Sequence, residues 1–290
     1  MIWAFLLQSL VNGVLTGGVY GLIAVGLTLI FGVMKIINFA HGSLMMLGMY
    51  ATFWCWSLFG LDPYVSLLLS VPLLFVVGAL IQKALIAPIM NAPEHNQLLL
   101  TLGVSLFVEN GALFAFKADP RFVQTGYLNV NYFVGPLTIK QVHLTAFAAS
   151  LLITLLLYLL LARTDLGKAI RAAAEEPEGA ALMGIDVKRI FWISFGIGAA
   201  CVGAAGTLIT PFFPADPHVG SLFVITAFVV VVLGGMGSFG GALVGGLIVG
   251  VGESVGAMFL QGSMKQMVTF LLFVAILLFR PTGLFGRRAG

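Results

Sequence analysis

The sequence predicts an all-α integral membrane protein, a polytopic bundle of about eight to ten transmembrane helices. Of the 290 residues, 60% are hydrophobic and only 9% are charged, and the mean hydropathy is +1.09. Successive windows of about 20 residues are nearly free of Asp, Glu, Lys and Arg, and a helix of that length crosses the bilayer. The short alternating strands of a β-barrel are missing, so helices are the expected spanning elements.

Nine apolar runs follow one another along the chain. The first is long enough to tilt or to be broken, and the seventh is short, so the number of crossings is open by one or two. The runs cover Phe5–Val33, Leu44–Phe59, Val65–Ile86, Leu98–Phe116, His143–Leu161, Phe191–Thr210, Leu222–Leu233, Ala242–Leu260 and Met267–Phe279. No linker separates them, and we predict one transmembrane domain over residues 1–290.

The distribution of Lys and Arg predicts the orientation, because cytoplasmic loops carry an excess of both. If Arg163–Arg189 and the tail residues Arg287 and Arg288 are cytoplasmic, ten Lys and Arg residues lie inside and four lie outside. The four external ones are Lys117, Arg121, Lys140 and Lys265. Nine crossings then make the N-terminus external, although a break in the first run would reverse that end.

Charge is concentrated in one segment, Arg163–Arg189, which holds ten of the 25 charged residues in 27 positions. Asp165 can cap a helix that runs through Glu175, Pro177 suits the first position of a second helix, and Gly184 suits its C-terminal stop. We expect two short amphipathic helices on a water-facing surface. From the residues alone, this segment is either a solvated cytoplasmic loop or a docking element.

Glycine spacing predicts close helix packing at two places. The early pattern is Gly13-x-x-x-Gly17-x-x-x-Gly21, and the late pattern is Gly237-x-x-x-Gly241-x-x-x-Gly245. Small residues at this spacing let two helix backbones approach closely in lipid. The same spacing also suits helices that slide during a gating cycle.

Four polar residues stand where membrane depth is expected. Asn38 and His41 interrupt two apolar runs, either as a cytoplasmic turn or as a broken, re-entrant segment that flanks a translocation path. Glu109 and Glu253 lie inside apolar runs, where an ionised side chain needs a wet cavity or a partner. Either Glu could attract a substrate ammonium group, and either could instead be held by hydrogen bonds within the protein.

The residues predict neither an enzyme nor a cofactor or metal site. Gly235-x-Gly237-x-x-Gly240 matches the dinucleotide fingerprint, but hydrophobic sequence continues on both sides, where a soluble βαβ unit is needed. Cys55 and Cys201 lack the spacing of a metal site or a disulfide. The basic residues lie beside membrane spans and form no stripe for nucleic acid.

Several motifs in order resemble one known family. They are GLTLIFGVMKIINFAHGSLMMLGMY at Gly26–Tyr50, TLGVSLFVENGALFAF at Thr101–Phe116, GKAIRAAAEEPEGAALMGID at Gly167–Asp186, VVVVLGGMGSFGGALVGGLIVG at Val229–Gly250 and RPTGLFG at Arg280–Gly286. The chain is similar to the permease subunits of bacterial branched-chain amino-acid ABC importers, of the smaller of two permease types. The resemblance extends from about Leu10 to Arg288.

The resemblance implies a fold related to the cobalamin and ribose importers, in a multi-pass protein of the inner membrane. It implies transport of leucine, isoleucine and valine by a complex in the lipid bilayer. The other subunits of that complex would be a second permease, two cytoplasmic ATPase subunits and a periplasmic binding protein. ATP hydrolysis then belongs to the partners, and this chain needs no cofactor. Two alternatives remain: a urea or short-chain amide permease of the same family, and a self-sufficient secondary transporter.

Under the resemblance, residues 163–189 become the segment that couples the permease to the ATPase. Three alanines would give a slim docking face, and the charged residues would set its register through pairs with the partner. The expected coupling residues are Gly167, Lys168, Arg171, Ala172, Ala173, Ala174, Glu175, Glu176, Pro177 and Gly184.

Overall fold

The computed structural model describes residues 2–259, 265–280 and 282–286, and each of the nine apolar runs forms a helix there. Leu260, Arg287 and Arg288 of the expectations above lie outside these residues. The helices are α1 (Ile2–Met34), α2 (His41–Phe59), α3 (Leu67–Ile81), α4 (Glu94–Phe116), α5 (Gln141–Arg163), α6 (Asp165–Glu175), α7 (Pro177–Leu182), α8 (Val187–Ile209), α9 (Val219–Gly234), α10 (Phe239–Gly256) and α11 (Lys265–Phe279).

Among the residues that the structure describes, six helices are long and apolar enough to cross a membrane: α1, α3 with its continuation to Ile89, α4, α5, α8 and α10. The continuation of α3 consists of a π-helical turn, Gln82–Ile86, and a 3-10 turn, Ala87–Ile89. The apolar helices α9 and α11 are shorter, with 16 and 15 residues. The all-α, multi-span prediction is therefore confirmed.

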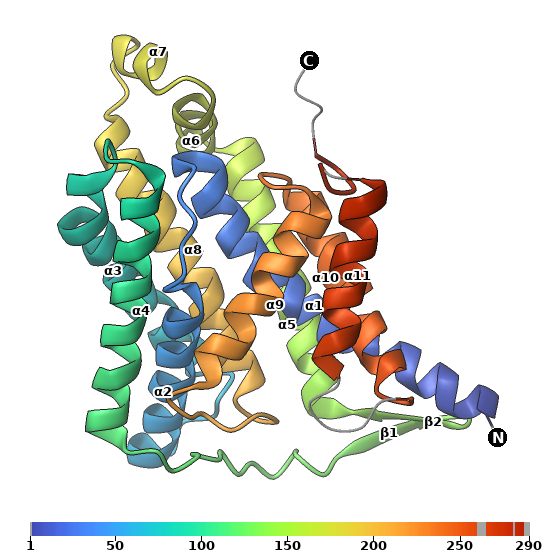
Figure 1. Ribbon diagram of the computed structural model, residues 1–290. Coiled ribbons are helices and arrows are strands. Elements are labelled where there is room, and N and C mark those ends of the chain that lie inside the picture. The colour runs from blue at the N-terminus through green and yellow to red at the C-terminus, as the bar shows by residue number, and fades with distance from the viewer. Residues whose placement is uncertain (1, 260–264, 281, 287–290) are drawn as a thin grey trace.

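Helix α1 is the central element of the bundle. Its 33 residues give a length of about 50 Å, which exceeds the hydrocarbon thickness of about 30 Å. A helix longer than the bilayer is thick accommodates by tilting, and α1 runs obliquely through the molecule in Figure 1. It packs against α5, α8, α9 and α10.

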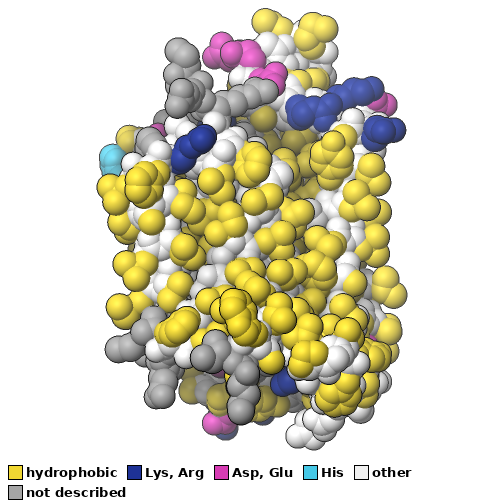
Figure 2. All heavy atoms as spheres, turned by 90° about the vertical axis from the view of Figure 1, so that its right-hand side faces the viewer, with side chains coloured by type: hydrophobic (Ala, Val, Ile, Leu, Met, Phe, Trp, Pro, Cys, Tyr) yellow, Lys and Arg dark blue, Asp and Glu magenta, His cyan; other side chains and the backbone are white. Residues whose placement is uncertain are grey.

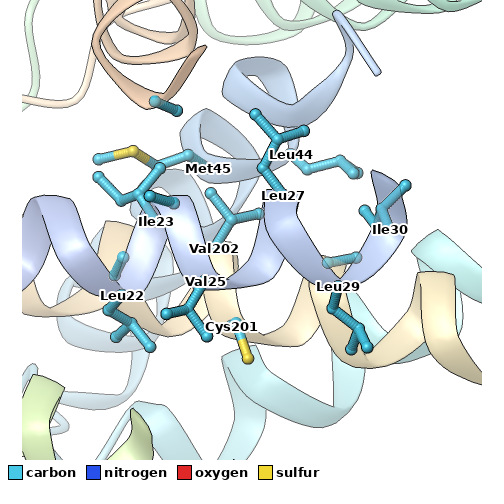
Figure 3. Close-up of a cluster of buried hydrophobic side chains, with 14 of the residues drawn as sticks. Leu22, Ile23, Val25, Leu27, Leu29, Ile30, Leu44, Met45, Cys201 and Val202 are labelled. Carbon is cyan, nitrogen blue, oxygen red and sulfur yellow. The ribbon is translucent and has the colours of Figure 1, made fainter. Parts of the chain in front are cut away.

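The apolar core lies where α1, α2 and α8 meet. Figure 3 shows Leu27 and Ile23 of α1 beside Leu44 and Met45 of α2, with Val202 of α8 between the helices. All five side chains are almost completely buried. Close packing of this kind stabilises helix association in lipid, where there is little hydrophobic driving force between helices.

Hydroxyl groups add polar contacts between the same helices. The Thr52 hydroxyl on α2 lies 2.9 Å from Oγ1 of Thr207 on α8, and the Ser70 hydroxyl on α3 lies 2.7 Å from the same atom. The three side chains are fully buried. They therefore join α2, α3 and α8 by interhelical hydrogen bonds.

The two ends of the bundle differ in character (Figure 1). The short helices α6 and α7 lie at one end together with the C-terminal end of α11, and the start of α1 lies at the opposite end with the two-stranded hairpin. Figure 2 shows a broad hydrophobic band on one flank, with the charged side chains gathered towards the two ends. This arrangement agrees with the prediction that the N-terminus and Arg163–Arg189 lie on opposite sides of the membrane.

A two-stranded hairpin lies at the end opposite α6 and α7 (Figure 1). Strand β1 (Asn131–Val134) pairs antiparallel with β2 (Leu137–Lys140), and Asn131 lies opposite Lys140. The side chain of Gln8 donates to the Thr138 carbonyl at 2.7 Å and accepts from the Thr138 amide at 2.8 Å. The hairpin is thereby fastened to the first turns of α1.

The glycines of α1 pack against α10, as the early pattern predicts. A Cβ atom on Gly17 would lie 2.7 Å from the carbonyl oxygen of Gly246, and one on Gly21 would lie 3.3 Å from the Cα of Leu243. Only glycine permits such an approach of the two backbones. The residues of α10 that make this contact with α1 include Gly246 and Gly250, which the sequence patterns did not single out.

The late glycine pattern was assigned partly wrongly. Gly241 and Gly245 do pack closely, but against α9: a Cβ on Gly245 would lie 2.7 Å from the Val230 carbonyl oxygen. Gly237 lies before α10 in the turn from α9, with φ +86° and no atom within 4 Å of an added Cβ. Its role is conformational, because this turn needs a positive φ that side chains rarely adopt.

Candidate functional site

The helical structure is interrupted between α1 and α2, and the chain turns back into the bundle there. After Met34 the backbone runs without helical structure through Lys35–Ala40, and α2 starts at His41 beside the middle of α1 (Figure 1). The Ile37 carbonyl accepts a hydrogen bond from Thr101 of α4 at 3.1 Å. The chain therefore returns into the bundle here and contacts α4, which agrees with the broken-segment alternative better than with a simple cytoplasmic turn.

Asn38 and His41 hold this segment in place. The Asn38 Oδ1 accepts from the Ala40 amide at 3.1 Å, and the His41 Nε2 lies 3.0 Å from the Ile23 carbonyl oxygen. Both side chains are fully buried. In this structure they fix the start of α2 against α1, and their expected position beside a translocation path stays a prediction.

The starts of α2 and α9 meet inside the bundle. A Cβ atom on Gly220 of α9 would lie 2.6 Å from the carbonyl oxygen of Gly42 in α2. Both helices thus begin within the bundle and not at its ends. Discontinuous helices of this kind are typical of transport proteins, where irregular backbone is tolerated only inside protein or beside water.

Glu109 of α4 pairs with His218, the residue before α9. The Oε1 of Glu109 lies 2.5 Å from the Nδ1 of His218, and their side chains are 21% and 64% exposed. The amide of His218 also donates to Asp216 at 2.8 Å. Glu109 therefore has a polar partner at the surface between α4 and α9.

Glu253 lies in a cavity of about 760 Å³ between α1, α9 and α10, which we term the Glu253 cavity. Its Oε2 accepts from the Tyr20 hydroxyl at 2.8 Å, and its Oε1 accepts from the Thr269 hydroxyl at 2.7 Å. Side chains lean towards the N-terminus of their own helix, so Tyr20 and Glu253 on antiparallel helices reach towards each other. The lining residues are Ser9, Asn12, Thr16, Tyr20, Phe213, Leu222, Phe223, Thr226, Gly250, Glu253, Ser254, Ala257 and Met258.

The expected coupling segment forms two short helices at the charged end. Thr164 caps α6, because its Oγ1 accepts from the Gly167 amide at 3.1 Å. The expected cap, Asp165, is instead the first residue of α6 and pairs with Lys168 at 2.8 Å. This hydrogen bond, and then the positive charge of Lys168, lower the pKa of the Asp165 carboxyl.

The three alanines do not form a single docking face, which corrects that expectation. Ala173 is fully buried, whereas Ala172 and Ala174 are partly exposed. Successive helical residues point about 100° apart, so three in a row cannot share one face. Gly167 is also packed inward: a Cβ there would lie 2.5 Å from the Leu160 carbonyl oxygen.

The outward face of α6 is charged. Asp165, Lys168, Arg171 and Glu175 are all exposed, whereas Ile170 is buried against the bundle. The Nη1 of Arg171 donates to the Leu161 carbonyl at the end of α5. A cationic side chain is favourable near the carbonyl groups at a helix C-terminus, so this bond fastens α6 to α5. Arg171 nevertheless remains exposed to solvent.

Helix α7 presents apolar side chains to solvent. Pro177 occupies its first turn and Glu176 precedes it, as predicted, and Gly184 follows it with φ +83°. Leu182 is 90% exposed and Met183 is 84% exposed. Two large apolar side chains beside charged residues are typical of a protein interface.

Sequence reasoning missed Leu182 and Met183, the Thr164 cap, and the partners of Glu253, which are Tyr20 and Thr269. Leu182 and Met183 look like ordinary members of an amphipathic helix until their exposure is known. Thr164 could have been found, since Thr is a preferred cap and stands three residues before Gly167. Within the described part of the chain, no group of three His, Cys, Asp or Glu residues could hold a metal ion.

Comparison with known proteins gives the family. Residues 9–277 match the family described as branched-chain amino acid transport system / permease component. The chain belongs to this family. It is 34% identical to the high-affinity branched-chain amino acid transport system permease protein BraD of Pseudomonas aeruginosa, over 97% of this chain and 96% of that protein. No solved structure matches the chain.

Two further relatives extend the comparison. The LivH permease of Escherichia coli is 31% identical over 98% of this chain and 96% of its own length. The probable LivH permease of Methanocaldococcus jannaschii is 31% identical over 91% of this chain and 88% of its own. This member of the branched-chain permease family is therefore a multi-pass inner-membrane transport component and not an enzyme, and it works in a system with other subunits.

Proposed function

We propose that this permease carries branched-chain amino acids across the inner membrane as one of two membrane subunits of an ABC importer. The observation that supports the substrate is the similarity over nearly the full length to three permeases named for these amino acids. The other subunits of the proposed complex are a second, related permease, two cytoplasmic ATPases and a periplasmic binding protein. Substrate affinity would then reside mainly in the binding protein.

The proposed mechanism is alternating access driven by the ATPases. Helices α6 and α7 would sit against an ATPase and pass its closing motion to the bundle. Three features support this role: the exposed pair Leu182 and Met183, the charged outer face of α6, and the bond from Arg171 to the end of α5. That bond would transmit a push on α6 directly to a membrane-spanning helix.

The partner subunits can be tested by co-purification. We would isolate the tagged chain from detergent-solubilised native membranes and identify what accompanies it by mass spectrometry. The proposal predicts an ATPase and a second permease. If the chain is recovered alone and still moves solute in liposomes without ATP, it is a secondary transporter and the proposal is wrong.

The substrate can be tested with the co-purified complex in proteoliposomes. We expect ATP-dependent uptake of leucine, isoleucine and valine in the presence of the binding protein. If the complex takes up urea or short-chain amides and no leucine, the proposed substrate is wrong, and the assignment to the ABC importer class stands.

The docking role of α7 has its own test. Leu182→Ser with Met183→Ser should reduce co-purification of the ATPase about tenfold or more, because buried apolar anchors dominate interface energies. Leu182→Met keeps an apolar side chain and should leave the complex intact. Undiminished recovery of the ATPase with the double variant would remove α7 from the interface.

A further inference from the structure

The Glu253 cavity has the position and size of a ligand site. Its volume of about 760 Å³ lies within the range of about 300 to 1,000 Å³ found for small-molecule sites. Its α1 residues, Ser9 to Tyr20, come from the N-terminal part of that helix, and its α10 residues come from the C-terminal part. The cavity therefore lies in the half of the bundle away from α6 and α7 (Figure 1).

Among the lining residues that the structure describes, Glu253 supplies the one carboxylate, and no side chain is Lys, Arg or His. Among the side chains that the structure describes, none forms an ion pair with Glu253. An acidic side chain at membrane depth is costly and points to function, because its charge must be met by water, a partner or a ligand.

The two hydroxyl donors orient this carboxylate and leave part of its hydrogen-bonding capacity available. Tyr20 and Thr269 contribute one hydrogen bond to each oxygen, and each carboxylate oxygen can accept two. Thr269 is buried, and the ring of Tyr20 packs edge to face on Phe223 with centroids 6.3 Å apart. The carboxylate is thus held by α1 and α11 and retains free lone pairs for a cationic group.

Apolar side chains and neutral hydrogen-bond donors line the rest of the cavity. Phe223 also packs edge to face on Phe213, with centroids 5.5 Å apart, and Leu222 continues this apolar wall. Asn12 accepts from Gln8 through Oδ1, which leaves its amino group as a donor. The hydroxyls of Thr16 and Ser254 are further neutral donors in the lining.

We propose that the Glu253 cavity is a transit site for a zwitterionic amino acid with an aliphatic side chain. The Glu253 carboxylate receives the ammonium group, and Phe213, Leu222 and Phe223 receive the side chain. The neutral donors Asn12, Thr16 and Ser254 face the substrate carboxylate. This assignment deepens the proposed function and rests on it.

The first test measures leucine uptake by the assembled importer in proteoliposomes. Glu253→Gln keeps the shape of the side chain and removes its charge, and we expect uptake to fall about tenfold or more, as for loss of a hydrogen bond to a charged group. ATP hydrolysis stimulated by the loaded binding protein should persist. Glu94→Gln, an acid-to-amide change at the exposed start of α4, is the matched control and should transport normally.

A second test does not depend on the Gln variant. Ser254→Cys, in a background with Cys55 and Cys201 replaced by Ala, places a thiol in the cavity lining. We expect a methanethiosulfonate reagent to label it, and leucine supplied with the binding protein and ATP to slow that labelling severalfold. Urea should give no protection.

The outcomes separate this inference from the function on which it rests. If the unmodified importer does not transport leucine, the proposed function fails. If it transports leucine while Glu253→Gln transports at the same rate, or leucine leaves the labelling unchanged, only the transit site is wrong.

Discussion

The Nε2 of His41 lies 3.0 Å from the carbonyl oxygen of Ile23, which joins the first turn of α2 to the middle of α1. This contact sets where α2 begins. Because a ring nitrogen must carry the proton to reach a carbonyl oxygen, His41 donates through Nε2. The bond turns the chain back into the bundle and lets α2 start beside α9.

Removal of this contact should destabilise the permease. We expect His41→Ala to lower the free energy of unfolding by about 2 to 4 kcal/mol, because the variant loses a buried hydrogen bond and opens a cavity. Unfolding in mixed detergent micelles, followed by circular dichroism, measures this change. His95→Ala, at an exposed position near the start of α4, is the control, and an equal loss there would refute the role of the His41 bond.

The contact between α1 and α10 should be intolerant of a methyl group. A Cβ on Gly246 would lie 2.6 Å from the Cα of Gly21, so Gly246→Ala forces two backbones apart and should cost about 1 to 3 kcal/mol. Gly240→Ala is the matched control on the same helix, since nothing lies within 4 Å of its added Cβ. We expect Gly240→Ala to be neutral or stabilising. The melting temperatures of the two purified variants provide the measurement, and an equal melting temperature for both would contradict the close contact at Gly246.

The Glu109–His218 pair should show energetic coupling between α4 and α9. A double-mutant cycle with Glu109→Gln and His218→Gln should give a coupling of about 0.5 to 1 kcal/mol, because the half-exposed pair is partly screened. The free energies of unfolding of the four proteins provide the measurement. Strictly additive losses would mean that the two groups act independently.

Gly184 should be needed for the shape of the coupling segment. Its φ of +83° strains any other residue, and a β-branched side chain is especially unfavourable there. We expect Gly184→Val to uncouple ATP hydrolysis from uptake in proteoliposomes while the protein still inserts and folds. Gly179→Ala, within α7 and with an ordinary φ, should keep coupling close to normal. Normal coupling in Gly184→Val would remove this turn from force transmission.

Much of the fold could be predicted from the residues. The apolar runs predicted the positions and order of the apolar helices, and the distribution of Lys and Arg predicts which ends share a side of the membrane. Pro177 and Gly184 marked the limits of α7 because their backbone preferences are local. The glycines of α1 were recognised as a packing stripe because their spacing of four residues is also a local property of the sequence.

The glycines of α10 show where such reasoning stops. Gly245 and Gly246 are neighbours in sequence, but they point about 100° apart and pack against different helices, α9 and α1. The spacing rule identified one stripe and could not name its partner. Ala173 was misassigned for a related reason, because the bundle beneath α6 decides which alanine is buried.

The sequence by itself determined the class of protein, its long apolar helices and its family, because hydropathy and motif order are properties of the chain alone, and the orientation inferred from charge bias stays a prediction. Only the tertiary structure decided that α2 and α9 start inside the bundle, and that Tyr20, Glu253 and Thr269 meet at one cavity. Tyr20 lies 233 positions from Glu253 in the chain, and helix tilt and packing set which side chains converge. Such convergence depends on contacts across the whole bundle, which no local pattern encodes.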